Sequence, residues 1–443
     1  MGSFVYETIK CRITYTKDSV IRNSPVANYK TNKGAGLVSR NLSQSTVYLI
    51  YTGASSMFFS LVFTVSQVYR IDTINLNPFQ LLLVGTVLET ACFIFEIPTG
   101  IVADIKSRKL SVIIGTTLIG AAFILEGSIP LFASVIISQI LWGLGYTFTS
   151  GADDAWIADE LGGKGLDHIY LKGTQVGQLF SFLGIICSTL IGSVMVNLPI
   201  IIGGILFISL SVLLAFLMKE TNFTPSPAED RNSWQQMVHT FVKGIRFIKG
   251  NPLLLLMMAT ALLYGLYSEG IDRLWTAHFL TDIELPDIIN LKPVVLIGII
   301  EGIAMLLSIA SVEYIKRRME KSGKLDRVWI LMLINVFMIA FMILFGLTGN
   351  FSLALSAYLG FYMLRTANEP IYRAWRNKNI KSEIRATVIS TYGQIDALGQ
   401  IIGGPIIGLI AMKTSISMAI VASALILTPV IILLIYGSKF TKA

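Results

Sequence analysis

The chain has 443 residues, of which 53% are hydrophobic and only 14% are charged, and its net charge is +8. Soluble domains carry about a quarter charged residues, so this composition excludes an ordinary water-soluble protein and indicates a chain held mostly in lipid. The positive charge alone would suit nucleic-acid binding, but the placement of the basic residues, described below, argues against it.

The first 44 residues are polar and basic, and they lack the apolar core of a secretory signal peptide. We interpret residues 1–44 as a cytoplasmic tail. The three cysteines share no metal-like spacing and the three histidines form no cluster, so we expect neither a metal nor another cofactor.

Twelve continuous apolar segments follow the tail, each about as long as the roughly 20 residues that a helix needs to cross a membrane. Continuous runs exclude the alternating pattern of a transmembrane β-barrel. The fold class is therefore all-α and integral to the membrane. The predicted spans lie near 46–69, 79–103, 110–129, 131–157, 170–196, 198–218, 252–281, 293–315, 328–348, 350–374, 385–412 and 415–437.

Thirty of the 35 lysines and arginines fall in the two tails and in every second connection. Arg70, Lys292 and Lys413 are predicted in connections on the other side, and Arg273 and Arg365 lie within spans. Basic residues gather on the cytoplasmic side of membrane proteins, so we expect a plasma or inner membrane protein with both termini in the cytoplasm. This topology explains the net charge without nucleic acid.

The longest connection, 219–251, divides the spans into bundles at 45–218 and 252–437, followed by a short cytoplasmic tail at 438–443. Within it, "SWQQMVHTFVKGIRFIK" at 233–249 places apolar residues at helical spacing, which predicts an amphipathic helix on the inner membrane surface. A solvated linker helix is the alternative.

The two sets of six spans show a faint internal repeat. Duplicated units are common in transporters, and a shift of 216 residues aligns several polar and small residues here. The matches are Gly177 with Gly393, Gln178 with Gln394, Gly192 with Gly408, and Asp153 with Glu369.

A cluster of charged residues follows the second span, in "GIVADIKSRK" at 100–109. The spacing of Gly100, Asp104 and the basic pair Arg108 and Lys109 resembles the loop signature of the major facilitator superfamily. Lys106 stands one place later than the first basic residue of that signature. The resemblance implies two six-helix bundles that expose one central cavity to each side in turn.

Within that superfamily the chain is most similar to bacterial drug-efflux members, through "EIPTGIVAD", "SEGIDRLW" and "RATVISTYGQIDALGQIIGGPIIG". That resemblance implies coupling to protons. Two departures stand out: Gln139 occupies the place of an arginine that many proton-coupled exporters carry, and the Gly-Pro signature of span five is absent.

The resemblance also implies a gating latch at the cytoplasmic ends of the helices, in which basic residues bind carboxylates of neighbouring helices and the signature aspartate faces the start of span eleven. The alternative is that these charges only set the topology. The candidate latch residues are Gly100, Asp104, Lys106, Arg108, Lys109, Asp153 and Asp154.

Inside the spans, acidic residues outnumber the two arginines. Glu269 and Arg273 are four residues apart, as are Arg365 and Glu369, which is the spacing of an intrahelical ion pair. We single out four further acids that have no obvious basic partner: Glu89, Asp272, Glu301 and Asp396.

Such carboxylates should face a wet cavity, carry a proton or balance a cationic substrate. Asp396 is the first choice among them, and Gln178 and Gln394 add polar contacts. Structural carboxyls hydrogen-bonded between helices are the alternative.

We therefore predict a monomeric secondary transporter, not an enzyme, that exports amphipathic cationic small molecules in exchange for protons, as a multidrug antiporter conferring antibiotic resistance would. An importer of a nutrient or metabolite with the same fold is the first alternative, since fold does not determine function. A membrane-embedded enzyme is a remote one.

Overall fold

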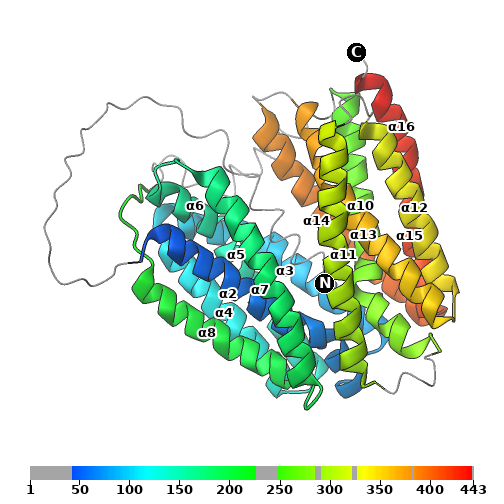
Figure 1. The fold of residues 1–443 in the computed structure, drawn as a ribbon, viewed down its shortest axis with the longest axis horizontal. Helices are drawn as coiled ribbons and strands as arrows, with labels where there is room; N and C mark the ends of the chain where they lie inside the picture. The colour runs from blue at the N-terminus through cyan, green and yellow to red at the C-terminus, as the bar shows by residue number, and fades with distance from the viewer. Residues whose placement is uncertain are drawn as a thin grey trace, which may run out of the picture.

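The computed structural model describes residues 42–225, 248, 250–284, 291–321, 327–380 and 384–441. These residues are helical apart from turns and one isolated bridge between Glu284 and Asn350. The helices form two bundles side by side, from blue to green and from light green to red in Figure 1. The tail at 1–41 lies outside the described residues, as does nearly all of the expected amphipathic helix, of which only Ile248 is described.

The first bundle has six spanning segments, because a short π-helix continues the first helix and a turn divides the fourth. Asn77 and Gln80 form a capping box at the start of α3, and Ser107 caps α4. The helices are α2 (Gln44–Val68), η1 (Tyr69–Thr73), α3 (Pro78–Ile105), α4 (Arg108–Ser128), α5 (Phe132–Thr149), α6 (Ala152–Glu160), α7 (Leu166–Gly192) and α8 (Leu198–Leu217).

The second bundle also has six segments. Asn251 and Asn350 cap α10 and α13 with their side chains, and proline stands in the first turn of α10, where its missing N–H costs nothing. The helices are α10 (Pro252–Thr281), α11 (Pro293–Lys321), α12 (Arg327–Leu347), α13 (Phe351–Lys378), α14 (Arg385–Lys413), α15 (Ile416–Ile426) and α16 (Thr428–Thr441).

Helices occupy all twelve predicted segments, and the predicted all-α membrane fold is confirmed. Eleven helical segments of the described chain are long and apolar enough to cross a membrane. The twelfth, α13, has the length but carries Arg365, Glu369 and Arg373 in its second half. Arg70 was predicted in a connection, and this is wrong: it lies in η1 and is 3% exposed.

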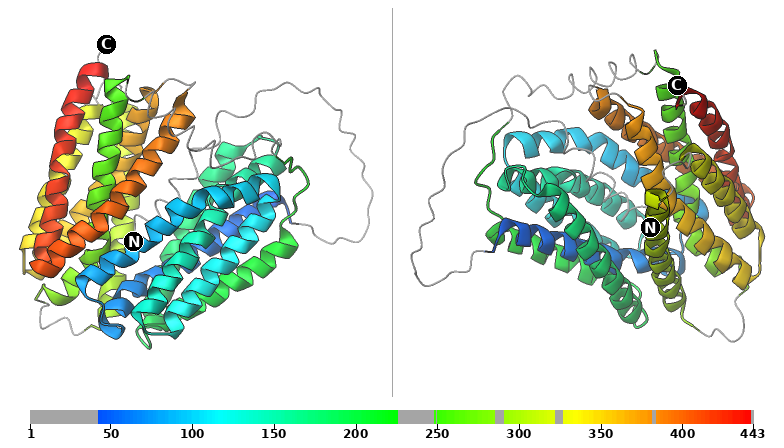
Figure 2. Two further views of the ribbon diagram at one scale, coloured as in Figure 1. Left: turned by 180° about the vertical axis from the view of Figure 1, so that it is seen from behind. Right: turned by 45° about the horizontal axis from the view of Figure 1, so that its top comes forward.

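The two bundles repeat one arrangement of helices. Figure 2 shows both bundles from behind and with the top of the molecule tilted forward. α7 packs along α2, and α14 packs along α10. These are the first and fifth spans of each half, the correspondence that a shift of 216 residues predicts. The second contact needs glycine, because a Cβ at Gly399 or Gly403 would lie only 2.5 or 2.6 Å from a backbone oxygen of α10.

Each bundle has six spans, so its first helix begins and its last helix ends on the same side of the molecule. We call this side the linker end, defined by Gln44, Leu217, Pro252 and Thr441, and the opposite side the far end.

The bundles meet at the far end and diverge toward the linker end. At the far end, a Cβ on Gly408 of α14 would lie 2.9 Å from Phe79 of α3 and 3.4 Å from Leu82. Gly100 lies on the same face of α3 as Leu82, about five turns away. A Cβ there, or on Gly393 nearer the start of α14, would meet no described atom within 4 Å.

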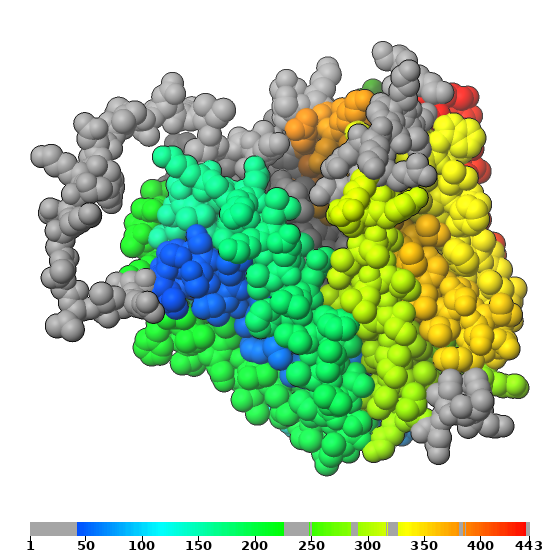
Figure 3. Space-filling view, in the orientation of Figure 1, coloured from blue at the N-terminus to red at the C-terminus, as the bar shows by residue number. Residues whose placement is uncertain are grey.

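α7 and α11 also bring the two bundles into contact near the far end, as α3 and α14 do. Thr189 of α7 lies against Gly298 of α11, close to the far end of both helices. Figure 3 shows the green surface of α7 meeting the yellow-green surface of α11 in the lower part of the molecule. Among the described residues, the structure is therefore open toward the linker end.

Candidate functional site

Two charged side chains of α10 face the first bundle. Glu269 and Arg273 form the predicted intrahelical ion pair, with Arg273 Nε 3.3 Å from Glu269 Oε2, and both are largely buried. They pack against Gly85 of α3, where a Cβ would collide with both side chains. Arg273 also interacts electrostatically with Glu89, one turn further along α3. The pair therefore connects the two bundles.

Arg365 of α13 binds Asp272 of α10, so the predicted pairing of Arg365 with Glu369 is wrong. Both terminal nitrogens of Arg365 engage the carboxylate, and Nη2 lies 2.8 Å from Oδ2. Glu369 pairs instead with Arg373, at 3.2 Å. Asp272, which has no basic residue four places away in the sequence, thus receives one from another helix.

A hydrogen bond between the bundles joins α2 and α11. Thr64 Oγ1 donates to Glu301 Oε2 at 2.7 Å. The other carboxylate oxygen, Glu301 Oε1, is buried and has no hydrogen-bond partner among the described residues. Glu301 is therefore held from one side only.

These side chains form one electrostatic group. The hydroxyl of Tyr358 interacts electrostatically with Glu301, Asp272 and Arg365, which links the α11 carboxylate to the α10–α13 pair. We call the group the polar centre and define it as Glu89, Glu269, Asp272, Arg273, Glu301 and Arg365. Four carboxylates thus share the region with two guanidinium groups.

The remaining predicted polar residues lie elsewhere along the fifth and eleventh spans. Asp396 Oδ2 accepts a hydrogen bond from Gln400 Nε2 at 3.1 Å, and the backbone oxygen of Asp396 lies against Gly265 of α10. Asp396 thus belongs to the packing of α14 on α10. Gln178 and Gln394 are half-buried at matching positions of α7 and α14.

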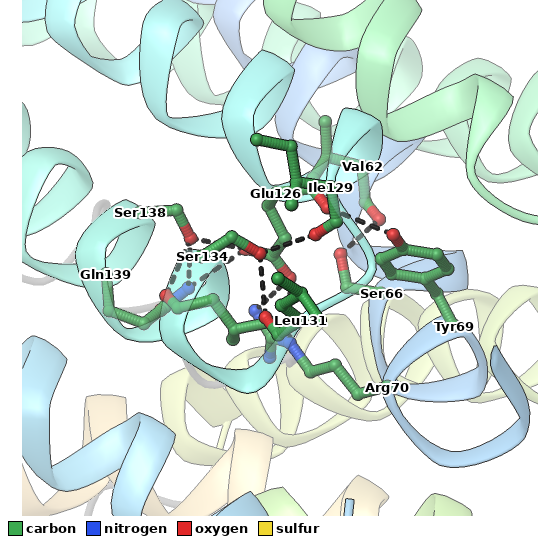
Figure 4. A network of polar contacts seen from close by, with 11 residues as sticks. Val62, Ser66, Tyr69, Arg70, Glu126, Ile129, Leu131, Ser134, Ser138 and Gln139 are labelled. Atoms are coloured by element: carbon green, nitrogen blue, oxygen red, sulfur yellow. Dashed lines mark hydrogen bonds and ion pairs between the residues drawn. The ribbon is translucent and has the colours of Figure 1, made fainter. Parts of the chain in front are cut away.

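A further buried charge pair, which the sequence did not reveal, lies toward the far end of the first bundle. Arg70 Nε and Nη2 lie 2.8 and 2.7 Å from Glu126 Oε1. The other oxygen, Oε2, accepts from Ser138 at 2.9 Å and from Gln139 at 3.0 Å, as Figure 4 shows. The Tyr69 hydroxyl donates to the backbone oxygen of Glu126.

The sequence does not single out Arg70 or Glu126 as buried charges. Arg70 directly follows the first apolar run and Glu126 stands near the end of the third, where charged residues are expected to face water. The residue in the sequence that could have pointed to this pair is Gln139. It occupies the place of the exporter arginine, and the structure brings an arginine from another helix to the carboxylate that Gln139 also binds.

Among the predicted latch residues at the linker end, Arg108 binds one of the carboxylates at the end of the fourth spanning segment, which the sequence offered as its partners. Arg108 binds Asp159 at 2.8 Å rather than Asp153 or Asp154. Asp154 instead accepts a hydrogen bond from the hydroxyl of Tyr48 at 2.9 Å. These contacts join helices of the first bundle.

Glu220 provides a further anchor for the signature segment. Its carboxylate accepts hydrogen bonds from the backbone N–H groups of Arg108 and Lys109 and from the hydroxyl of Ser107. A carboxylate at a helix N-terminus is stabilised by the unpaired N–H groups and the helix dipole. Asp104 and Lys106 are exposed beside it at the end of α3.

A model of the Major Facilitator Superfamily matches residues 47–404. The chain belongs to this superfamily. An uncharacterized MFS-type transporter of Bacillus subtilis (strain 168), YxaM, is 22% identical over 354 residues, which cover 80% of this chain and 86% of that protein. The protein is thus a multi-pass membrane transporter of the major facilitator type rather than an enzyme.

Solved transporters share its fold at low sequence identity. A variant of the nucleoside transporter NupG aligns with a TM-score of 0.74 and 15% identity, covering 89% of this chain and 99% of that one. A variant of the peptide transporter POT aligns with a TM-score of 0.70 and 13% identity, covering 89% and 94%. The human organic anion transporter MFSD10 aligns with a TM-score of 0.57 and 13% identity, covering 88% and 98%.

Proposed function

We propose that this transporter exports small amphipathic cations in exchange for protons, with both termini in the cytoplasm. The observation that carries the proposal is the composition of the polar centre, which holds two more carboxylates than guanidinium groups. In a region from which lipid and protein exclude water, excess negative charge is costly. A bound cation or proton offsets that cost.

The placement of the polar centre fits alternating access. Two of its contacts, Thr64 with Glu301 and Gly85 with the Glu269–Arg273 pair, cross between the bundles and must break if the bundles separate there. Rocking of two halves about a central site is the usual motion of this architecture. Because the bundles diverge toward the linker end, the described conformation admits substrate from that end, which the topology prediction places in the cytoplasm.

Glu301 is our candidate for the exchanged proton, in place of Asp396. Its Oε1 has no hydrogen-bond partner among the described residues, so it can take up a proton without displacing one. Protonation would also weaken the hydrogen bond that its carboxylate accepts from Thr64 across the interface, because bonds to charged acceptors are the stronger ones. Proton uptake and separation of the bundles would then be coupled.

Transport by the purified protein in liposomes tests this. With an imposed pH gradient, we expect movement of the lipophilic cation tetraphenylphosphonium against its own gradient, and little movement of a neutral analogue of the same size. Glu301→Gln should lose the pH-driven step while still exchanging the cation down its gradient. Glu313→Gln, on an exposed part of the same helix, is the matched control and should behave as wild type. Equal movement of cation and neutral analogue would refute the proposal.

Uptake of a zwitterionic or anionic metabolite is the second candidate. It is favoured by the two guanidinium groups of the polar centre, Arg273 and Arg365, and by the fold shared with transporters described as carrying nucleosides and peptides. Uptake of labelled nucleosides and dipeptides into the same liposomes distinguishes it from export of cations.

A further inference from the structure

One carboxylate of α3, Glu96, belongs neither to the polar centre nor to the predicted latch. It follows Gly85 by eleven residues and Glu89 by seven, and this spacing places all three on one side of a helix. Gly85 packs against the charged pair of α10 in the second bundle. Glu96 is therefore directed toward the second bundle, about 10 Å nearer the linker end than Glu89.

Glu96 is exposed although it lies deep within a spanning helix. α3 ends at Ile105, so Glu96 stands about 14 Å inside the end of the helix. A charged side chain at such a depth faces a water-filled cavity or the interior of the bundle. The diverging bundles provide the open space here, because a Cβ on Gly100, one turn further along α3, would meet no described atom within 4 Å.

No described residue balances the charge of Glu96. Its carboxylate forms no hydrogen bond or ion pair within the described part of the chain, and no neighbouring charge acts on it. Glu89 and Glu269, by contrast, interact with Arg273. In the described conformation, the negative charge of Glu96 therefore depends on solvent that enters from the linker end.

The wall of α14 that faces this space carries no basic residue at the level of Glu96. α14 runs antiparallel to α3 and touches it with Gly404 beside Thr86. Ala397 and Gly393 precede Gly404 by seven and eleven residues, so they continue the same face toward the linker end. The basic residues of α14 are its first and its last, at the two ends of the helix. This wall can approach Glu96 closely but cannot neutralise it.

Closure of the linker end would therefore enclose an unbalanced carboxylate. If the bundles rock so that α3 and α14 meet beyond Glu96, near Gly100 and Gly393, solvent can no longer reach the side chain. An ionised group that loses its water without gaining an opposite charge is strongly destabilised. The polar centre already holds more carboxylates than guanidinium groups, so it cannot supply the missing charge.

We propose that Glu96 binds the cationic substrate on the linker-end side of the polar centre, and that the linker end closes only when a cation neutralises this carboxylate. The inference rests on the proposed function, because it takes the transported molecule to be a small amphipathic cation. Phe93, half-buried and about one turn from Glu96, adds an aromatic surface that suits such a cation. A transporter without substrate would then stay open at the linker end instead of closing empty.

The first test needs no substrate. Spin labels at the exposed positions Lys106 and Lys378, in the full-length protein without its native cysteines, report closure of the linker end by double electron–electron resonance. At pH 7.5, Glu96→Gln should enrich short distances at least about threefold over wild type, because an uncharged amide loses its water at lower cost. Glu96→Asp keeps the charge and should resemble wild type.

The second test uses tetraphenylphosphonium as the cation. It should shift the wild-type protein toward short distances and should add little to the closure of Glu96→Gln. In equilibrium dialysis, Glu96→Gln should bind tetraphenylphosphonium at least about tenfold more weakly than wild type, since the charged partner is lost. Glu313→Gln makes the same chemical change at an exposed position of α11 and is the control, which should match wild type in both tests.

Unchanged distances or unchanged affinity in Glu96→Gln would overturn the inference, as would a Glu96→Asp variant that behaves like Glu96→Gln. If wild type transports tetraphenylphosphonium and Glu96→Gln binds it equally well, this inference alone fails. If wild type neither binds nor transports tetraphenylphosphonium, the proposed function fails together with the binding role of Glu96, even where Glu96→Gln closes the linker end.

Discussion

Arg70, at the far end of the first spanning segment, is bound to Glu126 near the end of the third, and their side chains are only 4% and 1% exposed. Neither residue was among the candidates from the sequence, which came from the segment at 100–109, from the acidic start of α6 and from polar and charged residues inside the predicted spans. The pair joins α4 to the short π-helix that follows α2, and through Glu126 it also reaches Ser138 and Gln139 of α5. It therefore fixes three spans of the first bundle relative to one another.

We expect single substitutions of this pair to be strongly destabilising, because each leaves one buried charge without its partner. Arg70→Met or Glu126→Leu should each cost about 3–5 kcal/mol. The double variant should cost clearly less than the two together, since no charge then remains. Thermal unfolding of the purified proteins measures this double-mutant cycle, and additive costs would contradict the interpretation.

Glycines along the α3–α14 contact should control which end of the molecule is closed. Gly404 lies against Thr86 at the far end, so Gly404→Leu should force the far end apart and favour a closed linker end. Gly393 lies in open space, so Gly393→Leu should fit the described conformation and oppose closure of the linker end. The two variants should shift the equilibrium in opposite directions.

Spin labels at the exposed positions Lys106 and Lys378, in a background without native cysteines, report the width of the linker end. Double electron–electron resonance should show a larger population of short distances in Gly404→Leu and a smaller one in Gly393→Leu. A shift of both variants in the same direction would contradict the assignment of the two ends.

Arg365→Lys should not replace arginine in the polar centre. Arg365 engages Asp272 with two nitrogens and also lies 5.6 Å from the ring centroid of Tyr267. A lysine has a point charge that cannot make the planar, two-pronged contact. We expect transport to fall at least about tenfold, equivalent to about 1.4 kcal/mol, with normal membrane insertion. Arg317→Lys, on the exposed part of α11, is the control and should leave the rate unchanged.

The topology prediction rests on the distribution of basic residues and can be tested separately. Single cysteines at Asn222 and Glu284 lie at the linker end and the far end. In intact cells, a membrane-impermeant maleimide should label position 284 and leave position 222 unlabelled until the cells are opened. Labelling of position 222 in intact cells would reverse the orientation and with it the proposed direction of transport.

Asp282, just beyond α10 at the far end, should make stability depend on pH. Burial alone would raise the pKa of Asp282, but hydrogen bonds from His278, Thr281 and Ser417 outweigh it and hold this pKa below its ordinary value of 3.8. A lowered pKa in the folded state adds stability above the ordinary value, and this contribution is lost as the pH falls through the lowered value. Asp282→Asn should therefore unfold at a lower temperature than wild type at pH 7, and the difference should shrink steadily as the pH falls below 3.8. A difference that persists at low pH would contradict this.

The positions of the spans could be predicted from the sequence because lipid permits few alternatives. In the hydrocarbon core of a membrane there is no water to bind the backbone N–H and C=O groups, so these groups must form hydrogen bonds within the chain. Each long apolar run is therefore expected to be helical. Even α13 was found despite its charges, since the apolar residues before Arg365 suffice to begin the span. The break within the fourth segment was missed, although Gly151 followed by two acidic residues is a typical helix start.

The partners of the buried charges could not be predicted in the same way. Spacing along one helix predicts contacts four residues away, which succeeded for Glu269 with Arg273. Arg365 could pair with a carboxylate of its own helix or with Asp272, and the choice depends on how α13 is rotated against α10. The residues near Arg365 in the sequence do not determine that rotation. The same limit applies to Arg70, whose partner lies 56 residues away.

The polarity of α13 has a consequence for how the protein is made. Eleven helical segments of the described chain are apolar enough to cross a membrane by themselves, and α13 is not among them. Arginine near the middle of a nascent helix opposes its partition from the translocon into lipid. The ribosome has already delivered α10 when α13 emerges, so the carboxylate of Asp272 is available to neutralise Arg365. We therefore expect α13 to enter the bilayer together with α10, and late synthesis to stall at this step when Asp272 is missing.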